Sequence, residues 1–202
     1  MLALTSLQEI GRELYAGKID RDGARSALAA LLLDHLECSR VSLWRFDGEP
    51  GTLALLCFAA KVAGEPLSTT ETRLHEPQYR AYFDGLVVTG MYVCTDAMND
   101  PRLAALREPY LLPHGVRSMM DAAILVNGRA YGMVCCEQTD AIRRWRKSEA
   151  ADLRAIVAKL ALLMASAGDA AFWNSPSVPI APIDSGVATP PTAILVPGDR
   201  RA

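Results

Sequence analysis

The chain has 202 residues, 50% of them hydrophobic, and its 21 basic and 23 acidic residues give a formal net charge of -2. This length fits one domain with its own core, and the near-neutral charge excludes a global basic field that would attract nucleic acid or anionic lipid. No apolar run approaches the roughly 20 residues of a membrane span, and the N-terminus lacks the basic region of a secretory signal, so we expect a cytoplasmic protein without membrane or nucleic-acid partners.

The first third of the chain predicts one helix and one hairpin. Apolar residues recur at helical spacing over 21–36, in a segment rich in Ala and Leu. Residues 41–46 and 52–62 have strand character, and the turn formers Asp47 to Gly51 separate them. A loop over 63–75 is expected to follow.

The middle third predicts short elements. Pro77 is expected to open a short helix that carries Tyr79, Tyr82 and Phe83, and a short strand is expected over 91–95.

A second short helix is predicted just beyond that strand. Asp100 fits an N-cap with Pro101 at the first helical position. Pro109 and Pro113 are expected to stop this helix near residue 108.

The clearest local signal is Asn127-Gly128 between the apolar runs 118–126 and 130–137, because Asn-Gly tolerates the positive φ angles of a tight hairpin turn. Ser148 can then cap a long amphipathic helix, which Gly168 would end. Residues 168–202 hold six of the 12 prolines among small residues, which predicts a disordered tail.

The segment 95–145 resembles the GAF domain of bacterial sensor histidine kinases and diguanylate cyclases. The residues that carry the resemblance are Asp96-Ala97, Asp100-Pro101-Arg102, Tyr110-Leu111, Gly115-Val116-Arg117-Ser118-Met119, Cys135-Cys136-Glu137 and Arg143-Arg144-Trp145. The resemblance extends over roughly 20–167, and its upstream part is generic.

The resemblance implies an α+β fold: a central antiparallel sheet of about five to six strands, with terminal helices on one face and a pocket roofed by helices and loops on the other. It implies three parts, namely an N-terminal helical lead-in over 1–19, the GAF domain over 20–167 and the tail over 168–202. The irregular middle third would form the roof of the pocket.

Candidate ligand-binding residues are aromatic and polar side chains expected to face that pocket, since ligand pockets combine apolar walls with a few convergent polar groups. The same rings could instead close the core over the sheet. The candidates are Tyr79, Phe83, Tyr92, Cys94, Tyr110, His114, Ser118, Asp121 and Glu137.

Asp121 interrupts an apolar strand, and a carboxylate buried there needs a donor. Strand alternation places Arg117 on the same face but too far along the strand, so Arg102 or Arg80 is a better candidate. Our hypothesis is that Asp121 and Glu137 orient the roof through arginines, a structural role that competes with ligand contact.

The five cysteines lie in apolar, strand-like settings without paired C-x-x-C spacing, and the adjacent Cys135 and Cys136 favour core packing. Cys94 lies near a strand end beside the loop from Thr95, where exposure could make it reactive. The segment 114–117 lacks the nucleophilic cysteine of the methionine sulfoxide reductase group, and the cysteine context of bilin-binding relatives is missing. The three histidines are far apart, so no metal site is predicted, no catalytic residue is assigned, and the cofactor is left unknown.

We therefore expect a stand-alone, non-catalytic GAF sensor or regulatory domain that binds a small molecule for signal transduction. It would act through a homodimer, formed by the apolar stripes of its helices, or through a separate kinase or cyclase partner. A protein-protein interaction module with no ligand is the alternative, and a thiol-based redox sensor or a methionine sulfoxide reductase-like enzyme is a third class.

Overall fold

The computed structural model describes residues 2–49, 52–68, 72–126, 129–166 and 178–179. Six antiparallel strands form one sheet in the order β3-β2-β1-β6-β5-β4. Their bounds are β1 Arg40–Asp47, β2 Ala54–Val62, β3 Arg73–His75, β4 Met91–Cys94, β5 Val116–Val126 and β6 Arg129–Thr139. The predicted α+β arrangement is confirmed, while β3 falls at the end of a segment predicted to be loop.

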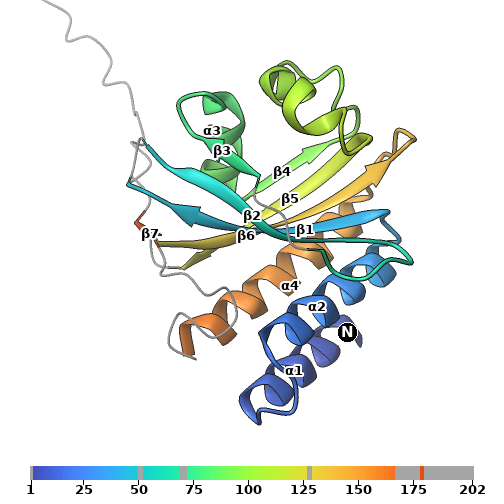
Figure 1. Ribbon diagram of the computed structural model, residues 1–202, viewed down its shortest axis with the longest axis vertical. Coiled ribbons are helices and arrows are strands. Elements are labelled where there is room, and N and C mark those ends of the chain that lie inside the picture. The colour runs from blue at the N-terminus through green and yellow to red at the C-terminus, as the bar shows by residue number, and fades with distance from the viewer. Residues whose placement is uncertain (1, 50–51, 69–71, 127–128, 167–177, 180–202) are drawn as a thin grey trace, which may run out of the picture.

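Three helices cover one face of this sheet (Figure 1). They are α1 Leu2–Tyr15, α2 Arg21–Leu36 and α4 Lys147–Ser166. The bounds of α2 match the prediction, because the Asp20 side chain accepts a 2.7 Å bond from the Gly23 amide and so starts the helix there. Their core, built on Leu28, Leu32, Leu153 and Ile156, is packed against the sheet.

The start of α4 differs slightly from the prediction. The Glu149 carboxylate, and not the Ser148 hydroxyl, accepts the free backbone N–H of Arg146, at 2.6 Å. A carboxylate in the first turn of a helix also interacts favourably with the helix dipole. The predicted stop at Gly168 lies outside the described residues.

The opposite face of the sheet is covered by α3 Arg80–Thr89, the 3₁₀-helix η1 Pro101–Leu106 and the π-helix η2 Arg107–Leu111. We call these three elements, together with the 95–100 loop before η1, the roof (Figure 1). The helix predicted at Pro77 begins only at Arg80. Pro109 does not stop the second helix, because it lies in the first turn of η2, where a missing N–H is tolerated.

The two longest strands, β5 and β6, pair from Val116↔Thr139 to Val126↔Arg129. The predicted turn Asn127-Gly128 between them lies outside the described residues. Of the predicted tail, only β7 Val178–Pro179 is described, and it pairs with Ala130 and Arg129 of β6; the rest lies outside the described residues.

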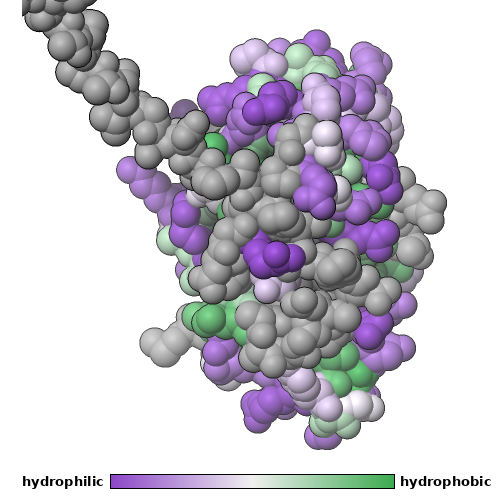
Figure 2. Space-filling view, turned by 90° about the vertical axis from the view of Figure 1, so that its left-hand side faces the viewer, coloured by the Kyte–Doolittle hydropathy of each residue, from purple (hydrophilic) through white to green (hydrophobic). Residues whose placement is uncertain are grey.

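On the face turned to the viewer in Figure 2, described hydrophobic side chains show only as small separate areas among hydrophilic ones. The part of the chain that the structure describes contains no helix long and apolar enough to span a membrane.

Candidate functional site

The candidate site lies between the sheet and the roof. Alternate residues of the central strands point to this side: Ser42 and Trp44 on β1, Asp121 on β5, and Cys135 and Glu137 on β6. Two buried carboxylates, Glu137 and Asp121, therefore lie on the same face of the sheet as the roof aromatics. Each carboxylate organises its own set of partners.

Glu137 is completely buried and forms an ion pair with Arg40, its cross-strand partner on β1, which is 4% exposed. The Tyr110 hydroxyl, from η2 in the roof, donates to Glu137 Oε1 at 2.7 Å and accepts from Arg40 Nη1 at 2.7 Å. A carboxylate, a guanidinium and a phenol thus satisfy one another in the interior.

Further polar and aromatic contacts surround the Glu137, Arg40 and Tyr110 side chains. The Trp44 indole donates to Ser42 Oγ at 2.9 Å, and Ser42 Oγ lies 3.4 Å from the Tyr110 oxygen. The His114 ring meets the Tyr110 ring edge to face at 4.9 Å between centroids. The Glu137 centre therefore reaches the loop after η2.

Charges fix the protonation states of this centre. Burial and the nearby Glu137 carboxylate raise the pKa of Tyr110 well above its ordinary value, so the phenol stays protonated. Burial opposes the charge on Arg40, but the Glu137 carboxylate outweighs it and raises the pKa of that guanidinium. Burial and the Arg40 charge lower the pKa of His114, which favours a neutral ring.

Asp121 is the second centre and is also completely buried. Its Oδ2 accepts a 2.7 Å hydrogen bond from the hydroxyl of Tyr82 on α3. Its Oδ1 meets no N–H or O–H donor within the described part of the chain. The other group that bonds this carboxylate is the Cys135 thiol, directly opposite on β6 and a weak donor.

The result is a carboxylate that is half satisfied. Burial raises the pKa of Asp121 from its ordinary value of 3.8 to about 7, although the bonds from Cys135 and Tyr82 pull it down. No cation neutralises it within the described residues, in contrast to Glu137. Asp121 therefore keeps one buried oxygen free to accept a hydrogen bond.

A third cluster joins β4 to the 95–100 loop. The Asp100 carboxylate accepts from the Tyr92 hydroxyl at 2.7 Å, from the Cys94 thiol at 3.4 Å and from the Arg102 amide at 2.9 Å. The Tyr92 ring meets the Tyr82 ring edge to face at 5.3 Å, so this cluster touches the Asp121 centre. A surface hollow of about 360 Å³ opens beside it, lined by Cys94, Asp100 and other residues of 93–102.

Most of the predicted candidates meet in these clusters. Tyr92 and Cys94 belong to the Asp100 cluster, Tyr110 and His114 to the Glu137 centre, while Phe83 packs edge to face on Tyr82 at 6.0 Å and Tyr79 is buried nearby. Ser118 is separate. It lies in the register of Met120 and Ala122, whose side chains pack on the helix side of the sheet, and its hydroxyl bonds backbone groups.

The hypothesis that Asp121 and Glu137 orient the roof through arginines does not hold for either carboxylate. Glu137 does pair with an arginine, but Arg40 lies on β1, and the bond from the roof comes from Tyr110. The arginines suggested for Asp121 have other contacts. Arg80 pairs with Glu76 and Asp84, and Arg102 lies over the Tyr92 ring at 5.7 Å. The neutral phenol of Tyr82 donates to Asp121 instead, and it supplies a hydrogen bond without a second buried charge that would have to be desolvated. Arg40 was not among the predicted site residues, although strand alternation places it, two residues before Ser42, on the roofed face of the sheet.

All five cysteines are buried, including Cys94, for which exposure at a strand end had been the alternative. Burial raises the pKa of Cys57 and Cys94 to about 12 and that of Cys135 well above its ordinary value, and contact with Cys38 together with burial does the same for Cys136. Among the described residues, no group of three His, Cys, Asp or Glu side chains is placed to hold a metal ion.

A single antiparallel sheet with helices on one face and a short-helix roof over buried polar groups on the other defines an α+β domain of three layers. Residues 20–164 match the model of the GAF domain, and the chain belongs to that family. A comparison with curated proteins gave no match.

Solved structures of similar fold include several GAF domains at low identity. The blue-light absorbing form of the Thermosynechococcus elongatus PixJ GAF domain is 20% identical, with a TM-score of 0.58, over 71% of this chain and 84% of that chain. The phycoerythrobilin-bound GAF domain from a cyanobacterial phytochrome is 17% identical, with a TM-score of 0.61, over 81% and 94%. The GAF domain of an Acinetobacter phosphoenolpyruvate-protein phosphotransferase is 15% identical, with a TM-score of 0.60, over 82% and 94%.

Proposed function

We propose that this protein is a non-catalytic GAF sensor domain whose small-molecule ligand is seated on the free Oδ1 of Asp121. Buried polar atoms in proteins almost always have a partner, and the absence of an N–H or O–H donor at a completely buried carboxylate oxygen in the described part of the chain is the observation that carries the proposal. One structural neighbour is a phycoerythrobilin-bound GAF domain, which supports a small-molecule ligand in a domain of this fold.

The charges nearby favour a ligand with an N–H or O–H donor. An anion would lie beside Asp121 and Glu137, and the charge of Arg40 is already used by Glu137. A neutral or cationic donor would instead complete the Asp121 bonds and regain the desolvation cost of that group. Tyr82, Tyr92 and Phe83 would supply apolar contacts, with His114 and Tyr110 at the far end of the site.

The ligand would bind without a covalent bond to sulfur. Attachment through cysteine requires a thiolate, and burial holds the pKa of Cys57 and Cys94 near 12. We propose no bilin chromophore, no redox role and no reductase activity for this chain.

The signal would leave the domain by association, in the cytoplasm, through a homodimer or a separate kinase or cyclase. Exposed apolar residues on the solvent side of α4, namely Ala151, Ala155, Ala158 and Leu162, support a helix-mediated dimer. We place the sensor domain at 20–167, with 1–19 as its lead-in and 168–202 as a tail.

Native mass spectrometry of freshly purified protein tests both parts of the proposal. We expect a complex of twice the 21.8 kDa chain mass that retains a small molecule, which denaturing extraction releases. The Asp121→Asn variant should keep the dimer and lose the molecule, whereas the exposed-site control Asp152→Asn should keep both. A wild-type dimer with no retained molecule would favour the interaction module, and retention by Asp121→Asn would remove Asp121 from the site.

A further inference from the structure

Three segments of the chain meet at the hydroxyl of Ser118, which is completely buried. Ser118 Oγ donates to the backbone oxygen of Thr95 at 2.6 Å and accepts from the backbone N–H of Arg143 at 2.7 Å. Thr95 begins the loop that leads into the roof, and Arg143 lies between β6 and α4. One oxygen on β5 therefore joins the roof side of the sheet to the start of the last helix.

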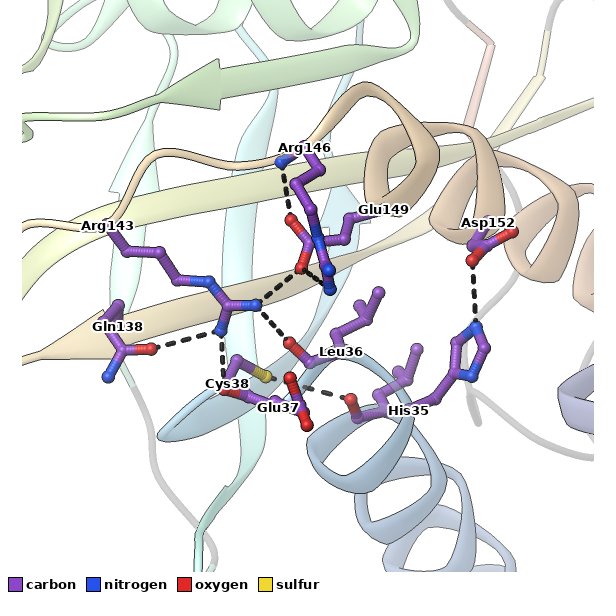
Figure 3. Close-up of polar contacts among 10 residues, drawn as sticks. His35, Leu36, Glu37, Cys38, Gln138, Arg143, Arg146, Glu149 and Asp152 are labelled. Atoms are coloured by element: carbon purple, nitrogen blue, oxygen red, sulfur yellow. Dashed lines mark hydrogen bonds and ion pairs between the residues drawn. The ribbon is translucent and has the colours of Figure 1, made fainter.

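The Arg143 guanidinium then ties two helices together (Figure 3). It donates to Leu36 O at 2.6 Å, the last carbonyl of α2, and to the carbonyl of the C-cap residue Glu37 at 2.5 Å. It also donates to Glu149 Oε1 at 2.7 Å, in the first turn of α4. The same Glu149 carboxylate accepts the Arg146 backbone N–H. The position of Arg143 thus sets the C-terminus of α2 and the N-terminus of α4 together.

The guanidinium has little freedom to adjust on its own. Its Nη1 also donates to Gln138 Oε1 at 3.3 Å, and its carbon lies 4.4 Å from the centroid of the buried Trp145 ring. A planar group that is bonded on several sides and stacked on a ring moves only together with its backbone. The backbone of Arg143 is the part that Ser118 holds.

The roof end of this connection reaches the Asp121 site. The 95–100 loop ends at Asp100, which accepts from Tyr92, and the Tyr92 ring touches Tyr82, the donor to Asp121. A displacement of Tyr82 or Tyr92 therefore moves the loop that begins at Thr95. Ser118 donates to Thr95 O and accepts from the Arg143 N–H, and a hydroxyl that donates one bond becomes a better acceptor for the next.

We infer that Ser118 and Arg143 couple the roof to the helical layer, so that opening of the roof loosens the first turn of α4 and the end of α2. The pair acts by position and does not touch the ligand. The inference rests on the proposed function for its biological meaning, since it describes how occupancy of the Asp121 site would reach the helices. Its physical content is a coupling between two regions, which can be measured without any ligand.

The test is hydrogen exchange read by mass spectrometry on a two-by-two set of variants. Tyr92→Phe removes the bond to Asp100 and opens the roof loop, and Ser118→Ala removes the junction. We expect Tyr92→Phe to speed exchange over 95–102. With Ser118 in place, it should also speed exchange of the two bonded amides at the start of α4, those of Arg146 and Ala150, by about fivefold, roughly the effect of losing one neutral hydrogen bond. In the Ser118→Ala background those α4 amides should exchange faster from the start and respond no further to Tyr92→Phe.

A matched control is Arg80→Ala, which removes the ion pairs of this exposed side chain with Glu76 and Asp84 and should leave α4 unchanged. The inference is overturned if Tyr92→Phe opens the loop without any effect on α4, or if the effect on α4 is the same with and without Ser118. Ser118→Cys, which keeps the size and weakens both bonds, serves if Ser118→Ala does not fold. Because no ligand enters this test, its result is independent of whether the proposed sensor function holds.

Discussion

The phenol of Tyr110 donates a 2.7 Å hydrogen bond to Glu137 and so fastens the roof to the centre of the sheet. The bond joins η2 to β6, and both side chains are buried.

Tyr110→Phe keeps the ring and removes only the hydroxyl that Arg40 and Glu137 share. We expect a loss of about 1 to 3 kcal/mol in the free energy of unfolding, because two buried charged groups lose a partner. Urea denaturation measures it, with the exposed Tyr15→Phe as a control that should change nothing; equal stabilities would show that the triad does not depend on the phenol.

Loss of one partner of the Arg40–Glu137 ion pair should lower the free energy of unfolding more than replacement of both partners by apolar residues. Removal of one partner leaves the other buried and uncompensated, so Arg40→Met alone is expected to cost about 3 to 5 kcal/mol. The double variant Arg40→Met/Glu137→Met removes both charges and should be more stable than either single variant. A double-mutant cycle by denaturant unfolding checks this, and additive losses would contradict it.

Asp121 predicts a specific pH dependence of stability. Because its folded pKa of about 7 lies above its ordinary value of 3.8, the folded state holds the proton more tightly than the unfolded chain. That stabilisation is complete below about pH 4 and is lost as the pH rises through 7. Relative to Asp121→Asn, the unfolding free energy of the wild type should fall by about 1.4 kcal/mol per pH unit over this range and then level off. Unfolding curves of both proteins from pH 4 to 8 measure it, and a constant difference would argue against a raised pKa.

The five buried cysteines should be inert in the native protein. At pH 8 the fraction of thiolate at Cys57 and Cys94 is small, since burial raises both pKa values to about 12. We expect no release of colour from DTNB within minutes in buffer, and complete reaction in denaturant. The variant Val88→Cys, at an exposed position of α3 outside the proposed dimer surface, should react at once. A fast native thiol in the wild type would restore the redox-sensor alternative.

The parts of the fold that could be predicted are those with local rules. The periodicity over 21–36 and the alternation over 41–46 and 130–137 gave the helix and strands, because core burial repeats every 3.6 or 2 residues. The secondary structure of the roof was predicted less accurately. Proline is often a helix stop, yet Pro109 is tolerated in a first turn, and nothing local distinguishes 3₁₀ and π geometry from an α-helix.

The candidate site shows a similar division. The sequence showed that Asp121 needs a donor, but charge alone pointed to arginines. The actual partner, Tyr82, lies 39 residues away, and its selection depends on how α3 sits over β5. Likewise Arg40 and Glu137 are separated by 97 residues and meet only because β1 and β6 are neighbours in the sheet. Such pairings follow from topology, which single-residue reasoning does not supply.

The roof is built from one helix of ten residues and two short non-α helices, and two tyrosine hydroxyls anchor it to buried carboxylates of the sheet. Segments with so few backbone bonds detach at a free energy well below that of global unfolding. The roof should therefore breathe as a separate cooperative unit while the sheet stays intact. The residence time of a molecule at Asp121 would then follow the rate of that subglobal opening, and a variant that strengthens only the strand pairing of the sheet would leave it unchanged.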